Sequence, residues 1–135
     1  MKNEISKINE GALSAILDVN KSGLGAFSAP YSREILLFTS IGVAGTRSIF
    51  NMDEIFPSLH PGSKVTFLRE PDNLNDKWAV KVLDSKQRHF GYLSFDCEEV
   101  VARLMDAGKA LFGKILNTEI RGDWHLIELE VYLDD

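Results

Sequence analysis

The sequence predicts a small, mostly antiparallel β-barrel of α+β type, built from about six short strands and two or three helices. Apolar and polar residues alternate in several segments between residues 34 and 133, and this period of two is typical of strands with one buried face. The helical patterns do not alternate regularly with the strands, which disfavours a parallel βαβ arrangement. The 135 residues suit one domain with a real core, since a chain of this size buries about two-thirds of its surface.

An extra N-terminal helix is predicted for residues 4–20, where apolar side chains recur at steps of three and four residues. These side chains are Ile5, Ile8, Ala12, Ile16 and Val19. Gly23 suits the residue that follows a helix, and residues 22–30 have the Gly, Ser and Ala content of a linker. We therefore divide the chain into a helix and linker over residues 1–32 and a β-barrel domain over residues 33–135.

A buried strand is predicted for residues 34–43, followed by a tight turn at the glycines of residues 42–45. Asn51 can cap a short helix that runs through Phe56 before the next proline ends it. Further strands are predicted at residues 64–69, 78–82, 89–93, 110–116 and 124–133. In the last strand, one face carries Ile127, Leu129, Val131 and Leu133.

A second helix, packed on the barrel, is predicted for residues 96–107. Asp96 and Glu99 have the spacing of a capping box, and Gly108 follows the last helical residue. The apolar face that we expect to pack is formed by Val100, Leu104 and Met105.

The charge is concentrated in one part of the chain. The net charge is −5, and residues 96–135 hold ten acidic and four basic side chains. A protein that binds nucleic acid through a general basic surface shows the opposite balance, so any such site must be local to residues 33–95. The single cysteine, Cys97, excludes an internal disulfide and, together with the lack of a spanning apolar run, predicts a cytoplasmic protein without a membrane partner.

The motifs of catalysis and cofactor binding are poorly represented. His60, His89, His125 and Cys97 lie in no nucleophile motif, and scattered histidines are a more frequent explanation than a triad assembled in space. One cysteine and three distant histidines lack zinc-ligand spacing. The glycines of residues 42–45 lack the following lysine of a P-loop. The sequence predicts no enzyme, no metal and no cofactor.

The densest polar stretch is residues 68–82, LREPDNLNDKWAVKV. Asp72, Asn73 and Asp76 can bond to nearby backbone amides and hold the turn between two strands. That structural role and a binding role are both open from the residues alone.

Several motifs follow one another in a fixed order: VAGTR at residues 43–47, LREPDN at 68–73, Asp76 with Ala79 and Val80, GYL at 91–93, and LMDAGKALFGKI at 104–115. Together they resemble the HIRAN domain, in its stand-alone bacterial form. The resemblance spans roughly residues 34–133, and the combination is more specific than any single motif. In eukaryotic relatives the domain is fused to fork-remodelling helicase machinery.

The resemblance implies an OB-like β-barrel that recognises single-stranded DNA, in particular a free 3′ end, in DNA repair or processing. By position, Arg47 matches an arginine for phosphate, and Asp76 matches the acid that accepts a hydrogen bond from the 3′ hydroxyl. The expected DNA-binding residues are Arg47, Ser48, Asp72, Asn73, Asn75, Asp76, Tyr92 and Trp124. The auxiliary basic residues are Arg69, Lys77, Lys81 and Arg88.

Three positions depart from the family pattern. Ser48 and Asn75 stand where the family has aromatic residues, and Phe95 stands where a basic residue is expected. Two lost stacking faces are worth about 2–6 kcal/mol of binding energy. The alternative function is therefore a protein-interaction or regulatory module, in which the acidic C-terminal third and the N-terminal helix contact a protein partner or a second copy.

Overall fold

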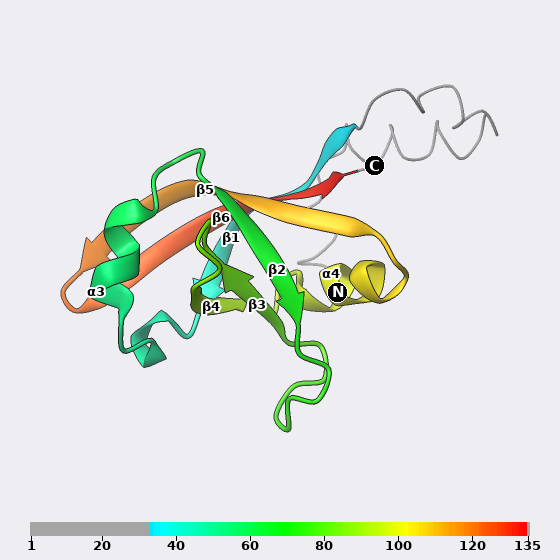
Figure 1. Cartoon of the computed structure of the whole chain (residues 1–135), viewed down its shortest axis with the longest axis horizontal. Coiled ribbons are helices and arrows are strands. Elements are labelled where there is room, and N and C mark those ends of the chain that lie inside the picture. The colour runs from blue at the N-terminus through cyan, green and yellow to red at the C-terminus, as the bar shows by residue number, and fades with distance from the viewer. Residues whose placement is uncertain (1–32, 135) are drawn as a thin grey trace.

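The computed structural model describes residues 33–134, and these residues form a closed sheet of six antiparallel strands with two short helices (Figure 1). The strands are β1 (Glu34–Ala44), β2 (Lys64–Arg69), β3 (Val80–Leu83), β4 (His89–Leu93), β5 (Ala110–Arg121) and β6 (Trp124–Asp134). The helices are α3 (Met52–Ile55) and α4 (Glu98–Asp106), with single 3-10 turns η2 (Thr46–Ser48) and η3 (Phe56–Ser58). The predicted N-terminal helix and linker lie outside the described residues.

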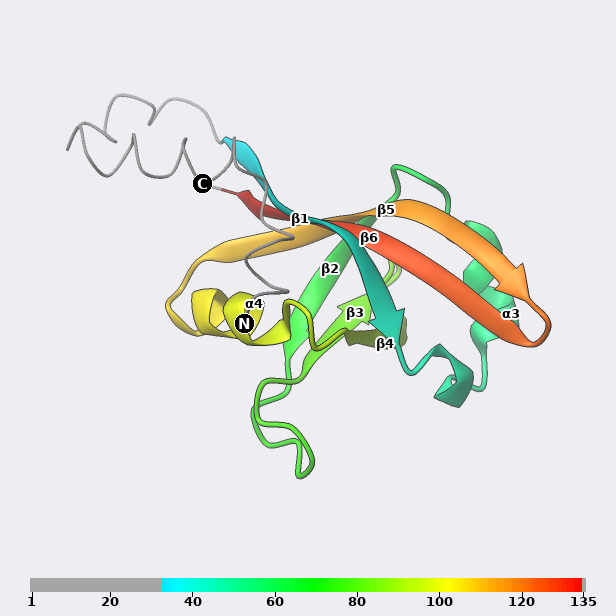
Figure 2. The same ribbon diagram turned by 180° about the vertical axis from the view of Figure 1, so that it is seen from behind.

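The sheet closes because β1 has two partners. The strand order is β1-β4-β3-β2-β5-β6, and β1 pairs with β6 through residues 34–42 and with β4 through residues 43–44. Two register shifts interrupt the pairing with β6, and Ser40 has a φ of 56°. Bulges of this kind increase the local twist, so β1 can cross from one neighbour to the other (Figure 2).

The interior is filled by the inward faces of the strands. All four residues predicted to share the inner face of β6 are buried, as are Val65, Val82 and Phe90 of the neighbouring strands. The helices α3 and α4 lie at opposite ends of the domain in both views (Figures 1 and 2). The predicted face of α4 does contact the core, but the fully buried residues of this helix are Val101 and Ala102.

Some boundaries differ from the prediction. β3 begins at Val80, so Trp78 lies outside the strand, half-buried beside the guanidinium of Arg103 at 4.5 Å from its ring centroid. β5 extends five residues beyond the predicted end at residue 116 and forms a long hairpin with β6. The residues of this extension are mostly polar on both faces, so their sequence has no alternation; pairing with β6 makes them a strand.

The turn after β1 and the N-terminus of α4 also differ from the prediction. Gly42 lies within β1 opposite Glu128, and the turn is made by Gly45 alone, with a φ of 77°. The N-cap of α4 is Cys97 rather than Asp96, so the helix begins one residue later than the predicted capping box places it. At the other end of α4, Gly108 and Lys109 donate to Met105 and Leu104 carbonyls, which is the predicted glycine-type helix end.

Gly91 is required where the end of β1 pairs with β4. Its φ is 157°, and a Cβ atom there would lie 2.7 Å from the Ala44 carbonyl oxygen and closer still to Val43. Neither obstacle is the end of a flexible side chain, so the two strands would have to separate.

We therefore expect Gly91→Ala to destabilise the domain by about 2–4 kcal/mol in chemical denaturation, through overpacking and backbone strain. Gly42→Ala is the matched control, because a Cβ atom at Gly42 meets nothing within 4 Å. Equal stability losses for the two variants would contradict a steric requirement for glycine at position 91.

Candidate functional site

The loop between β2 and β3 is organised by Asn73. Its side-chain oxygen accepts hydrogen bonds from the backbone N–H groups of Asn75 at 2.9 Å and Asp76 at 3.1 Å. Its amide nitrogen donates to Glu70 Oε1 at 2.6 Å, and Asp76 Oδ1 accepts from the backbone N–H of Trp78 at 2.9 Å. The predicted structural role is therefore real for Asn73 and Asp76, whereas Asp72 is exposed on the loop.

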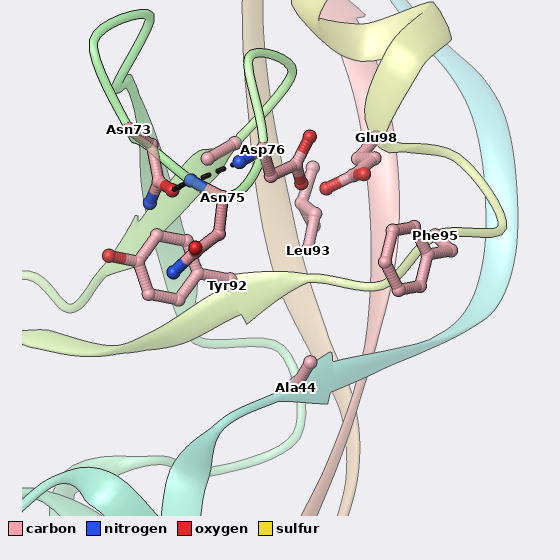
Figure 3. Close-up of a pocket in the computed structure, with 9 residues that line it drawn as sticks. Ala44, Asn73, Asn75, Asp76, Tyr92, Leu93, Phe95 and Glu98 are labelled. Atoms are coloured by element: carbon pink, nitrogen blue, oxygen red, sulfur yellow. Dashed lines mark hydrogen bonds between the residues drawn. The ribbon is translucent and has the colours of Figure 1, made fainter.

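A pocket of about 370 Å³ lies between this loop and the end of β4, and we call it the loop pocket (Figure 3). It is lined by Ala44, Asn73, Asn75, Asp76, Ala79, Tyr92, Leu93, Phe95 and Glu98. The carboxyl groups of Asp76 and Glu98 point toward one another on one side, and Tyr92 and Phe95 flank Leu93 (Figure 3). Phe95 is 82% exposed, so its ring is an open apolar surface at the rim.

A charged network anchors Tyr92. The Tyr92 hydroxyl donates to Glu70 Oε1 at 3.0 Å, and Lys81 Nζ lies 2.9 Å from Glu70 Oε2. Hydrogen bonds from Lys81, then Asn73 and Tyr92, lower the pKa of the Glu70 carboxyl from 4.5 to about 2. Burial and the same carboxylate raise the pKa of Tyr92, which keeps its hydroxyl protonated. The network connects β3, β4 and the loop on one side of the pocket.

Arg47 belongs to a second pocket, of about 380 Å³, which we call the arginine pocket. It is lined by Gly45, Thr46, Arg47 and Trp124. The Arg47 guanidinium lies 5.9 Å from the centroid of the Trp124 ring and 3.8 Å from a carboxylate oxygen of Asp123. The Arg47 side chain is 66% exposed, and a surface ion pair of this length holds it weakly, so it can turn toward a ligand.

The two pockets are neighbours on either side of residues 44–45. Ala44 lines the loop pocket, Gly45 lines the arginine pocket, and a Cβ atom placed on Gly45 would be 3.9 Å from the Tyr92 ring. The sequence predicted that Arg47 and Asp76 meet in one pocket, and the structure places them in adjacent ones. Ser48 is exposed and lies outside both sets of lining residues.

Three of the four auxiliary cations are bound to carboxylates. Arg69 holds Asp106 with contacts of 2.9 and 3.2 Å and also donates to the carbonyls of Lys77 and Ala79, which fixes the end of the loop. Lys81 pairs with Glu70 as described, and Arg88 pairs with the buried Asp84 at 2.8 Å. Lys77 is exposed, with its amine 5.1 Å from the Trp78 ring centroid. Arg69, Lys81 and Arg88 therefore stabilise the fold more than they supply free positive charge.

Glu98 is the site residue that sequence reasoning missed. It is the first residue of α4, where glutamate is ordinarily solvated, yet it is only 6% exposed. Burial and the hydrogen bond to Asp76 raise the pKa of Glu98 from 4.5 to about 7. No pattern in the sequence indicates this contact, because it joins residues 22 positions apart through the packing of α4 against the loop.

Among residues 33–134, no group of three or more His, Cys, Asp or Glu side chains is arranged to hold a metal ion. Within the same residues, no helix is long and apolar enough to cross a membrane.

The comparison with known families gives the class of the domain. The family model described as the HIRAN domain matches residues 37–134, so the chain belongs to the HIRAN domain family. No curated protein matches it significantly.

Two solved structures share the fold. A crystal structure of a protein from Lactobacillus plantarum matches with a TM-score of 0.70 and 23% identity, covering 78% of this chain and 99% of that one. The crystal structure of the HIRAN domain of human HLTF matches with a TM-score of 0.55 and 19% identity, covering 76% of this chain and 74% of that one.

We expect Glu70→Gln to remove about 1 kcal/mol of stability at pH 7, because the ionised carboxylate is the common acceptor of the Tyr92 network. The folded-state pKa of Glu70 is depressed, so its contribution is full above about pH 4.5 and is lost as the pH falls toward 2. Urea denaturation from pH 7 to pH 2.5 should show the two proteins converging as the pH falls. Glu54→Gln, on the exposed side of α3, is the control. A stability difference that does not change with pH would contradict the role of Glu70.

Proposed function

We propose that this chain is a non-enzymatic module that binds single-stranded DNA by its 3′ end across the loop pocket and the arginine pocket. Membership of the HIRAN family supports DNA binding, and we propose that the closed sheet acts as an OB-like barrel. The observation that carries the proposal is the adjacency of the two pockets at residues 44–45. A repair or processing context and a cytoplasmic location belong to the same proposal.

The two pockets supply the three kinds of group that a strand end requires. Arg47 offers a cation for a phosphate, and its weak pair with Asp123 is easily exchanged. Asp76 offers a carboxylate that can accept a hydrogen bond from a terminal hydroxyl. Trp124, Tyr92 and Phe95 offer aromatic surfaces on which bases can stack.

Binding should be weak and nearly independent of sequence. Among the residues that line these two pockets, Arg47 is the one cation, so few phosphates are neutralised and the salt dependence is shallow. Ser48 and Asn75 provide no stacking surface. We expect a dissociation constant that is micromolar or poorer.

A second candidate function is that of a protein-interaction module. Phe50 and Leu74 are 98% and 99% exposed, which is unusual for large apolar side chains, and most nearby cations are engaged in ion pairs. This combination favours a protein partner over a phosphate chain.

The first test compares labelled single strands with a free and a blocked 3′ hydroxyl by fluorescence anisotropy at two salt concentrations. If Asp76 accepts from the terminal hydroxyl, a blocked end should weaken binding more than shortening the strand does. Arg47→Ala should lose most of the affinity, whereas Arg33→Ala, which removes the same charge at the opposite end of β1, should retain it. Equal binding of free and blocked ends would refute recognition of the 3′ end.

The second test restores the missing rings. Ser48→Tyr combined with Asn75→Tyr should tighten binding at least tenfold, since each stacked base contributes about 1–3 kcal/mol. Leu74→Tyr, at the tip of the same loop but outside the lining residues, is the control. An unchanged affinity in the double variant means that the pockets do not face DNA, and the protein-interaction function is then preferred.

A further inference from the structure

The Asp76 and Glu98 side chains form a carboxyl pair in the loop pocket. They come from different elements, the loop between β2 and β3 and the first residue of α4, and their carboxyl groups point toward one another (Figure 3). Two carboxylates in contact repel each other, so a pair of this kind is held together by a shared proton. Because both residues line the pocket, the state of that proton decides the charge met by a ligand.

The surroundings of Glu98 favour its protonated form. The charged groups that act on it are Asp76 from the loop, Glu99 from its own helix and Arg69 from β2. Arg69 is the single cation of this set, and it is already bound to Asp106 and to two loop carbonyls. Tyr92, the titratable group that β4 adds to the pocket, is uncharged near neutral pH. In the described part of the chain Glu98 takes part in no ion pair.

Asp76 keeps room for a ligand while it accepts from Glu98. One of its oxygens already accepts the Trp78 N–H, and an ionised carboxylate has about four acceptor positions. A protonated Glu98 therefore fixes the orientation of Asp76 without saturating it. The pair then carries one negative charge instead of two, which lowers the repulsion felt by a neighbouring phosphate.

Resting on the DNA-binding function proposed above, we propose that Glu98 is a positioning residue that shares one proton with Asp76, so that oligonucleotide binding takes up a proton and weakens as the pH rises. The direction follows from the charges. Loss of the proton leaves two carboxylates in the pocket, and both repel an anionic strand. In the free protein this loss is centred near pH 7, the pKa of Glu98.

The test measures the dissociation constant of a single-stranded oligothymidine with a free 3′ hydroxyl at pH 6.0 and pH 8.5, at constant ionic strength. If bound phosphate raises the pKa of Glu98 by about one unit, the constant for the wild type should increase roughly five- to tenfold between the two pH values. In Glu98→Gln, which cannot ionise, this ratio should fall close to one. Glu54→Gln, which is exposed on α3 and is not among the charged groups that act on Glu98, should keep the wild-type ratio.

The three histidines of the chain are common to all these proteins, so the difference between variants isolates Glu98. A wild-type ratio that persists in Glu98→Gln overturns the inference and leaves the proposed function standing. No binding at either pH overturns both.

A second measurement needs no variant. Calorimetric titration of the wild type at pH 7, in buffers of different ionisation enthalpy, should show uptake of roughly 0.4 proton per oligonucleotide for the same one-unit shift. Binding without proton uptake would overturn the inference even if Glu98→Gln failed to fold.

Discussion

The pairing of β1 with both β6 and β4 shapes the domain and the surface that holds its two pockets. β1 follows β6 for most of its length and then pairs with β4, and these pairings close the sheet. The close approach is possible because Gly91 has no side chain. β1 ends at Ala44, which lines the loop pocket, and the next residue, Gly45, lines the arginine pocket. The two pockets form on either side of that point.

Most cations near the two pockets are paired with carboxylates and stabilise the fold. Arg69 ties α4 to the loop through Asp106 and two carbonyls, Arg88 neutralises the buried Asp84, and Lys81 pairs with Glu70. Paired cations contribute little to long-range attraction of an anionic strand. The surface that remains for a ligand consists of aromatic rings, Arg47 and one carboxyl pair. This composition is compatible with the local strand-end site that we propose in a chain with a net charge of −5.

Phe95 changes the chemistry at the rim of the loop pocket. A basic residue at this position would contact a phosphate, whereas an exposed phenyl ring offers a stacking face. The proposed function therefore relies more on base stacking and on the terminal hydroxyl than on phosphate charge. The same exposed ring would serve a protein partner equally well, and the salt and end-group dependence of binding distinguishes the two cases.

The sequence by itself determined the elements whose signals are local. The alternation in β2, β4 and β6 reflects which side chains are buried. It can be recognised without knowing how the strands pair, so these strands were predicted at nearly the observed bounds. The order of the VAGTR, REPDN and GYL motifs identified the family. Each motif forms a local feature that needs those residues: a turn, a loop or a close contact between two strands. Asn73 and Asp76 were correctly expected to hold the loop.

The tertiary structure decided everything that depends on distant partners. β5 continues past residue 116 because β6 supplies the hydrogen bonds, not because its own residues alternate. The auxiliary cations were predicted to contact DNA. Three of them instead bind carboxylates, which lie up to 37 positions away in the sequence. Arg47 and Asp76 line two separate pockets, which have neighbouring residues of the chain, Gly45 and Ala44, in their linings. Glu98 meets Asp76 only through the packing of α4. Side-chain charge and exposure at such places depend on long-range geometry, and a local pattern carries no information about it.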